Sequence, residues 1–287
     1  MESRVATANE GKKYLVVGSN GFIGKGLLDE LFRTRDIRPE KTPFYSYHSS
    51  EFAKANLSVI KAHKDISAIV FCGGIGGFGL SEESALLQRS QYTYFIDQCS
   101  RNRGLDRFFL ISSLGAAASR IQSPYKKLCK KKEILTTKLM GGKGMTIRLP
   151  GIYGYEPRSG TYKGLPGAIT HGLVRNIAVD IYGSLGTSRN YLSIQTASRA
   201  VITAILGFST GGARDYRTLN IANSHNLTTH LVLDILSRAH GRVPRLRMIR
   251  AKDIDAESHN IAFVDGIMSY LYSDLEQWSR KAANLVS

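Results

Sequence analysis

Residues 13–28, Lys-Tyr-Leu-Val-Val-Gly-Ser-Asn-Gly-Phe-Ile-Gly-Lys-Gly-Leu-Leu, decide the fold of the chain. Tyr14 to Val17 is a short apolar run, as a buried parallel strand requires. Gly18, Gly21 and Gly24 follow at a spacing of three, and the apolar residues beyond them recur at helical spacing. This succession of strand, glycine turn and helix predicts a phosphate-binding turn, because the N–H groups and the dipole at a helix start attract negative charge. A glycine-rich turn without a ligand is the alternative.

The length of 287 residues suits one large α/β domain or a domain with a small additional lobe. No apolar run approaches the roughly 20 residues that span a bilayer, so we expect no membrane span. Residues 1–11 are polar and predict a mobile tail rather than a signal peptide. The three cysteines are sparse and lack metal-binding spacing, so we expect no metal site and a reducing, cytoplasmic location.

The formal net charge of +16 favours polyanionic partners such as nucleic acid, an anionic membrane surface or a nucleotide diphosphate. The chain contains no nucleic-acid-binding motif, so we expect attraction of phosphorylated small molecules and no nucleic-acid partner. Lysines are dense over residues 126–132. They predict a solvated helix face, with an anionic ligand, lipid headgroup or partner protein as the alternative.

The spacing Gly-x-x-Gly-x-x-Gly, with Asn20, Phe22 and Ile23, resembles the extended short-chain dehydrogenase/reductase family. That family contains nucleotide-sugar epimerases, dehydratases and reductases. The resemblance implies a nicotinamide dinucleotide bound at this turn. The cofactor would be lined by the residues that match the motif, which are Gly18, Asn20, Gly21, Phe22, Ile23 and Gly24.

The end of the second predicted strand, Phe44 to Tyr47, sets the choice of cofactor in this fold. An acidic residue there would accept a hydrogen bond from the adenosine ribose 2′-hydroxyl and repel a 2′-phosphate. The chain instead continues with His48, Ser49 and Ser50, which we assign to the cofactor site, and has no carboxylate before Glu51. This favours NADP over NAD. One of the serines also suits the cap of the next helix, and the two roles are compatible.

The third predicted strand runs from Ile66 to Cys72 and is followed by Gly73 and Gly74. Small residues at this strand end let the backbone lie beside a cofactor. The resemblance therefore implies that Cys72, Gly73 and Gly74 contact the dinucleotide. The glycine-rich stretch 73–79 predicts a mobile loop near the nicotinamide end.

A fourth predicted strand, Phe108 to Ile111, leads into Ser113, and Tyr125 follows at a predicted helix start. This pair resembles the catalytic serine and tyrosine of the family. The family pattern Tyr-x-x-x-Lys is broken, because Cys129 stands where the lysine is expected. Lys126 and Lys130 lie about 100° and 140° from Tyr125 around the helix, so neither replaces the missing ammonium. Without that cation, we expect the Tyr125 pKa to stay near its usual value of about 10.

The stretch 148–154, Arg-Leu-Pro-Gly-Ile-Tyr-Gly, resembles the Arg-Pro-x-x-x-Tyr-Gly turn of extended family members, with Leu149 inserted. The resemblance implies that Pro150 and Ile152 contact the cofactor, as Tyr125 also does. Beyond this turn the family places its nucleotide-sugar contacts. The residues that we assign to the substrate there are Lys163 and Arg175.

A later stretch, residues 183–194, resembles a family segment whose arginine contacts the diphosphate of the ligand. Arg189 matches that arginine, and a guanidinium suits a diphosphate through its bidentate fork. The acids that usually follow are absent, since Asn190, Gln195 and Thr196 stand in their places. We therefore assign Arg189 to the substrate site of a divergent relative.

We predict an α/β protein with a Rossmann-type doubly wound parallel sheet and a smaller C-terminal substrate lobe. The expected divisions are a tail over 1–11, a dinucleotide-binding core over 12–155, and a mainly substrate-binding lobe over 156–287 with segments returning to the core. The further helices are predicted over 51–64, 81–101, 198–206, 228–240 and 265–283, and the further strands over 144–149 and 219–222.

The resemblance implies an NAD(P)-dependent oxidoreductase, epimerase or dehydratase that acts on a nucleotide-linked sugar, with room for a homodimer. Tyr125 would be the general acid and base, and Ser113 would hold the reacting oxygen. The alternative is a catalytically degenerate dinucleotide-binding sensor or assembly subunit, which the cysteine at position 129 favours.

Overall fold

The computed structural model describes residues 13–33, 45–47, 66–74, 80–117, 123–156, 159–209 and 217–249. The predicted tail over 1–11, the helices expected over 51–64 and 265–283, and the loop residues 75–79 lie outside the described residues. The chain divides into two compact units. The first holds the described residues up to Arg148 together with Ser198–Leu219, and the second holds Leu149–Ala197 and the described residues from Asn220 onward.

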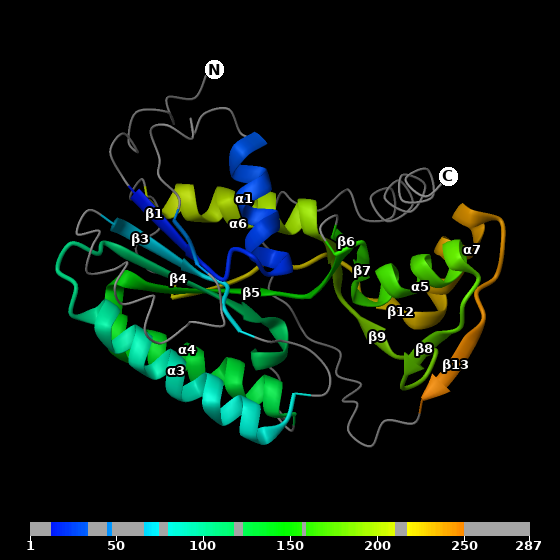
Figure 1. The fold of residues 1–287 in the computed structure, drawn as a ribbon, viewed down its shortest axis with the longest axis horizontal. Coiled ribbons are helices and arrows are strands. Elements are labelled where there is room, and N and C mark those ends of the chain that lie inside the picture. The colour runs from blue at the N-terminus through cyan, green and yellow to red at the C-terminus, as the bar shows by residue number, and fades with distance from the viewer. Residues whose placement is uncertain are drawn as a thin grey trace. The chain divides into compact units, whose positions relative to one another are not determined.

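A six-stranded sheet forms the centre of the first unit (Figure 1). β1 is parallel to both of its neighbours, β2 and β3, and β3 is parallel to β4. The predicted α/β fold with a parallel sheet is therefore confirmed. Because β2 and β3 flank β1 on opposite sides, the carboxyl ends of β1 and β3 form the crevice where open α/β sheets bind ligands. The strands in sheet order are β11 (Thr218–Asn220), β5 (Gly144–Leu149), β4 (Arg107–Ser113), β3 (Ile66–Phe71), β1 (Lys13–Val17) and β2 (Tyr45–Tyr47).

Helices cover both faces of this sheet. Figure 1 shows α3 (Glu82–Ser100) and α4 (Pro124–Met140) on one face, and α1 (Phe22–Arg33) and α6 (Ile194–Ser209) on the other. The buried core between sheet and helices includes Phe71, which packs against other aromatic rings of β4 and α3. No helix in the described part of the chain is long and apolar enough to cross a membrane.

The helix expected over 198–206 begins earlier than predicted, at Ile194. The Ser193 hydroxyl accepts a hydrogen bond from the Thr196 amide at 3.2 Å, which satisfies an N–H group of the first helical turn. The prediction missed this cap because residues 183–194 were matched as a whole to one family segment and the helix was placed after it.

Among its described residues, the second unit has short strands and the helices α5 (Gly164–Arg175) and α7 (Thr229–His240). The Thr228 hydroxyl caps α7 by accepting from the Leu231 amide at 3.1 Å. The strands that the structure describes here form three small sheets. They are β10 (Tyr191–Ser193), β6 (Gly151–Glu156) and β7 (Thr161–Lys163); β12 (Leu227–Thr228) and β9 (Ser188–Arg189); and β13 (Leu246–Ile249) and β8 (Val179–Tyr182).

Candidate active site

The glycine turn after β1 lies against the backbone that follows β3. Gly18 has a φ of +83°, a conformation that favours glycine, and a Cβ there would lie 2.8 Å from the Gly73 Cα. The amide of Cys72 donates to the Val17 carbonyl at 2.8 Å, so β1 and β3 remain hydrogen-bonded up to their carboxyl ends. The two strand ends are thus in direct backbone contact at the crevice of the sheet.

The other two glycines shape the start of α1. A Cβ on Gly24 would overlap the Gly18 carbonyl oxygen, so only glycine fits where the helix packs against the turn. Gly21 is exposed, and its amide donates to the Gly18 carbonyl at 3.0 Å. An exposed backbone without a side chain, next to a helix N-terminus, fits the close approach of a dinucleotide pyrophosphate. The other residues assigned to this turn lie beside Gly21 in the chain: Asn20 just before it, and Phe22 and Ile23 at the start of α1.

The residues after β3 are small and partly exposed. Gly74 has a φ of +134°, and a Cβ there would lie 2.7 Å from Gln88 Oε1 and 3.0 Å from Lys132 Nζ. Burial raises the pKa of the Cys72 thiol to about 12, so Cys72 remains a neutral thiol at neutral pH. The crevice is therefore lined on this side by the backbone of three small residues, Cys72, Gly73 and Gly74.

Ser113 and Tyr125 are brought together by β4 and α4. Ser113 ends β4, and its hydroxyl accepts from the Gly115 amide at 3.2 Å. The Ser123 hydroxyl caps α4 by accepting from the Lys126 amide at 3.3 Å, which places Tyr125 in the first turn. The side chains of Tyr125 and Ser113 are hydrogen-bonded to each other. Two hydroxyls that the sequence separates thus form one polar pair.

Cys129 lies one helical turn beyond Tyr125 and is 7% exposed. Its thiol is hydrogen-bonded to the Tyr125 hydroxyl and also to the Ser112 hydroxyl. Burial raises the pKa of both Tyr125 and Cys129, so both side chains are neutral at neutral pH. The expectation that the Tyr125 pKa would stay near 10 was wrong, because it considered the missing cation and left out desolvation of the phenolate.

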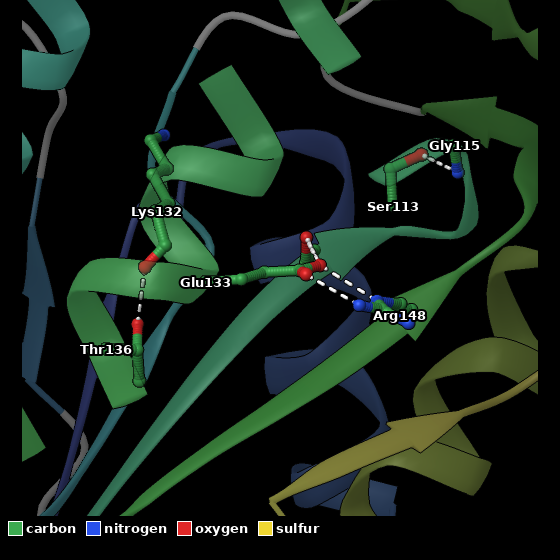
Figure 2. A network of polar contacts seen from close by, with 7 residues as sticks. Ser113, Gly115, Lys132, Glu133, Thr136 and Arg148 are labelled. Carbon is green, nitrogen blue, oxygen red and sulfur yellow. Dashed lines mark hydrogen bonds and ion pairs between the residues drawn. The ribbon is translucent and has the colours of Figure 1, made fainter. Parts of the chain in front are cut away.

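Glu133 and Arg148 form an ion pair between α4 and β5 (Figure 2). Arg148 donates from Nε and Nη2 to the two carboxylate oxygens at 2.9 and 2.7 Å, and the Ser112 hydroxyl donates to Glu133 Oε1 at 2.7 Å. The side chains of Glu133 and Arg148 are 7% and 14% exposed. The pair is a fixed, bidentate support for the end of β4.

The three substrate assignments fall on separate parts of the second unit. Lys163 precedes α5 and pairs with Glu156 at 3.4 Å, whereas Arg175 ends α5, about 17 Å away along the helix axis. Arg189 lies in β9, and its positive charge opposes the burial that raises the Tyr191 pKa to about 12. Lys163 and Arg175 are therefore not neighbours along α5.

A cavity of about 300 Å³ lies between α5 and β8 within the second unit. Tyr162, His171 and Tyr182 are among its lining residues. The rings of Tyr162 and His171 are stacked with centroids 5.6 Å apart. The cavity therefore has a flat aromatic wall.

Solved structures of known proteins resemble the whole chain. UDP-glucuronic acid 4-epimerase from Bacillus cereus, in complex with UDP-glucuronic acid and NAD, has a TM-score of 0.74 at 15% identity, covering 96% of this chain and 100% of that one. UDP-N-acetylglucosamine 4-epimerase from Methanobrevibacter ruminantium, in complex with UDP-N-acetylmuramic acid, has a TM-score of 0.70 at 15% identity, covering 96% and 98%. The chain has the fold of the UDP-sugar 4-epimerases. No protein-family profile and no curated protein sequence matches it.

Within this epimerase fold, the sequence analysis missed two buried polar residues. Ser19, in the glycine turn, is 2% exposed, and its hydroxyl has no hydrogen-bond partner among the residues that the structure describes. Lys132 is 8% exposed and donates to the Gly73 carbonyl at 3.2 Å. Lys132 is seven residues after Tyr125, a spacing that puts both on the same helix face. In the sequence analysis, only Lys126 and Lys130 were considered as replacements for the missing lysine.

The other residues that were assigned to the cofactor site lie outside the glycine turn. His48, Ser49 and Ser50 lie outside the described residues, so the choice between NADP and NAD stays a prediction. Pro150 precedes β6 and Ile152 lies within it, both in the second unit.

Proposed function

We propose that the chain is an NAD(P)-dependent enzyme of the extended short-chain dehydrogenase/reductase family that acts on a nucleotide-linked sugar, as an epimerase, dehydratase or reductase. The observation that carries this proposal is the hydrogen-bonded pair of Ser113 and Tyr125, on the same unit as the glycine turn. The NAD and UDP-sugars bound by structures of the same fold support it. A cytoplasmic location and a homodimer remain part of the proposal.

The proposed chemistry assigns one task to each side chain. Tyr125 gives a proton to the reacting oxygen of the sugar or takes one from it, and Ser113 holds that oxygen by a hydrogen bond. The Gly115 amide orients the Ser113 hydroxyl by donating to it at 3.2 Å. A bound dinucleotide supplies the acceptor and donor of hydride.

The second unit would hold the nucleotide part of the substrate. Arg189 offers a guanidinium to a diphosphate, and Lys163 is a second cation in the region assigned to the substrate. The aromatic wall formed by Tyr162 and His171 suits a flat ring such as a nucleobase.

A second function is favoured by the raised pKa of Tyr125 and by the thiol at position 129. A tyrosine with no cation to stabilise its phenolate is a poor base at neutral pH. The chain would then be a dinucleotide-binding sensor or a subunit of an assembly. Its crevice would still bind the dinucleotide, but it would not catalyse a reaction.

The first prediction concerns the cofactor. We expect NADP(H) to bind at least as tightly as NAD(H), because no carboxylate directly follows the second strand. Gly21→Ala should weaken both by about tenfold or more, since its methyl group would occupy the place where the pyrophosphate approaches the backbone. Calorimetry measures both affinities. In the matched control Gly207→Ala, the new Cβ meets nothing within 4 Å, so binding should be unchanged.

A clear preference for NAD(H) would contradict the NADP assignment alone. If the wild type bound neither dinucleotide, the whole proposed function would fail. Equal affinities of wild type and Gly21→Ala would remove the glycine turn from the site.

The second prediction concerns Arg189. Arg189→Ala should weaken binding of a UDP-sugar by about 2 kcal/mol, or roughly 30-fold, if the guanidinium forms a charge-assisted pair with the diphosphate. Calorimetric titration with UDP-glucuronic acid measures the loss. Arg242→Ala is the control, because Arg242 is exposed in the same unit. Unchanged affinity in a folded Arg189→Ala variant would exclude this arginine from the substrate site.

A further inference from the structure

Lys132 is a buried cation without a carboxylate partner among the residues that the structure describes. Lysine is almost never fully buried unless it is paired. Its ammonium donates to the Gly73 carbonyl at 3.2 Å and lies 5.5 Å from the ring centroids of both Phe71 and Tyr92. These contacts hold the ammonium in place, but they leave its charge without an anion.

The position of Lys132 on α4 brings its ammonium back toward the start of the helix. Seven residues separate it from Tyr125, which puts the two on one helix face, about 20° apart, with Cα atoms about 10 Å apart along the axis. Helical side chains lean toward the N-terminus of their helix. Figure 2 shows the Lys132 side chain leaving α4 in a different direction from Glu133, which points to Arg148.

The hydrogen bond to Gly73 places this charge at the crevice of the sheet. Gly73 is the residue that the Gly18 turn approaches most closely, since a Cβ on Gly18 would lie 2.8 Å from its Cα and amide nitrogen. A Cβ on Gly74 would lie 3.0 Å from Lys132 Nζ itself. The ammonium therefore lies directly behind the backbone edge between β1 and β3, where this class of sheet binds its ligands.

We infer that Lys132 is a positioning residue of the dinucleotide site: it fixes the Gly73 carbonyl at the crevice and supplies a buried positive charge behind it from α4. The inference rests on the proposed function, because its ligand is NAD(H) or NADP(H). The negative charge of a dinucleotide pyrophosphate would be the anion that the ammonium lacks among the described residues.

Few ionisable groups share this environment. On the described elements around Lys132 they are Cys129 and the adjacent Glu133 on α4, Tyr92 on α3, and Cys72, which precedes Gly73. Cys129 favours the charged form of Lys132 only when its thiol is ionised, and Glu133 is paired with Arg148. Burial lowers the pKa of Lys132 from 10.5 to about 8, so the amine is mostly charged at pH 7 and loses its proton as the pH rises through 8.

Calorimetry with NAD(H) and NADP(H) tests the inference. Lys132→Met keeps the length and apolar character of the side chain and removes the charge and the donor to Gly73. We expect its dinucleotide affinity to be at least tenfold lower than that of the wild type. Lys131→Met, the exposed neighbour on the same helix, should bind as the wild type does.

Proton uptake on binding gives a second, independent readout. An anionic ligand beside Lys132 stabilises the ammonium, so its pKa rises on binding and the wild type takes up a proton near pH 8, by up to about half a proton per site. The binding enthalpy should then depend on the ionisation enthalpy of the buffer, and the affinity should fall as the pH rises above 8. Both effects should be absent in Lys132→Met.

The outcomes separate the two proposals. If the wild type binds a dinucleotide and Lys132→Met binds it equally well, the role of Lys132 is overturned and the proposed function stands. If the wild type binds neither dinucleotide, the proposed function fails and the inference fails with it. Should Lys132→Met not fold, proton uptake by the wild type decides alone, and its absence near pH 8 would refute the inference.

Discussion

Replacement of Tyr125 by phenylalanine is expected to lower the turnover of a nucleotide sugar by about 10²- to 10⁴-fold, the usual contribution of a general acid or base. Phenylalanine keeps the ring in place and removes only the hydroxyl that is hydrogen-bonded to Ser113 and Cys129. Turnover is followed by chromatography of the sugar products. Tyr94→Phe is the matched control, because Tyr94 is 50% exposed on α3 and should retain full activity.

The pH dependence of the reaction should reveal the missing cation. Burial raises the Tyr125 pKa and no lysine at position 129 opposes this, so the deprotonated base is scarce at neutral pH and becomes more abundant in alkali. Oxidation that begins with proton removal should therefore be slow at pH 7 and accelerate as the pH rises. A reduction uses Tyr125 in its protonated form and should depend less on pH.

Cys129→Lys tests this account directly. An ammonium one turn from Tyr125 favours the phenolate and should lower the Tyr125 pKa, so oxidation at neutral pH should increase. Thermal unfolding reports whether the buried position accepts the longer side chain. If a folded Cys129→Lys variant changes nothing and Tyr125→Phe is also without effect, the pair is vestigial and the non-enzymatic function takes precedence.

Local patterns predicted the first unit well. The apolar run before Gly18, the glycine spacing and the strand over 144–149 each specify their structure within a few residues, and β1, α1 and β5 formed where they were expected. The helix predicted over 228–240 also formed, as α7, because a hydroxyl before an apolar helical pattern is a local signal.

Contacts between distant segments were not predictable in the same way. The strands of the second unit have two to six residues, and pairs such as β12 with β9 depend on partners far apart in the sequence. Lys132 was hidden for a related reason. Its position in a lysine-rich run suggested a solvated face, whereas its contact with Gly73 depends on how α4 packs against β3.

Glu133→Gln is expected to lower the free energy of unfolding by about 3 kcal/mol, because it leaves the largely buried Arg148 guanidinium without its anion. The amide keeps the shape of the side chain, so the loss reports charge rather than packing. Chemical denaturation measures it. Glu82→Gln is the matched control: Glu82 pairs with Lys127 at 3.0 Å, but these side chains are 61% and 51% exposed. This change should cost less than about 1 kcal/mol.

The consequence of Glu133→Gln should extend to the catalytic pair. Glu133 accepts from Ser112, whose hydroxyl is also hydrogen-bonded to Cys129, the partner of Tyr125. If the ion pair holds the end of β4 in place, the variant should lose turnover as well as stability at a temperature where it remains folded. If the variant kept full turnover and its free energy of unfolding fell by about 3 kcal/mol, Glu133 would stabilise the fold without a role in catalysis. Equal losses of stability in Glu133→Gln and Glu82→Gln would contradict the assignment of a special, buried pair.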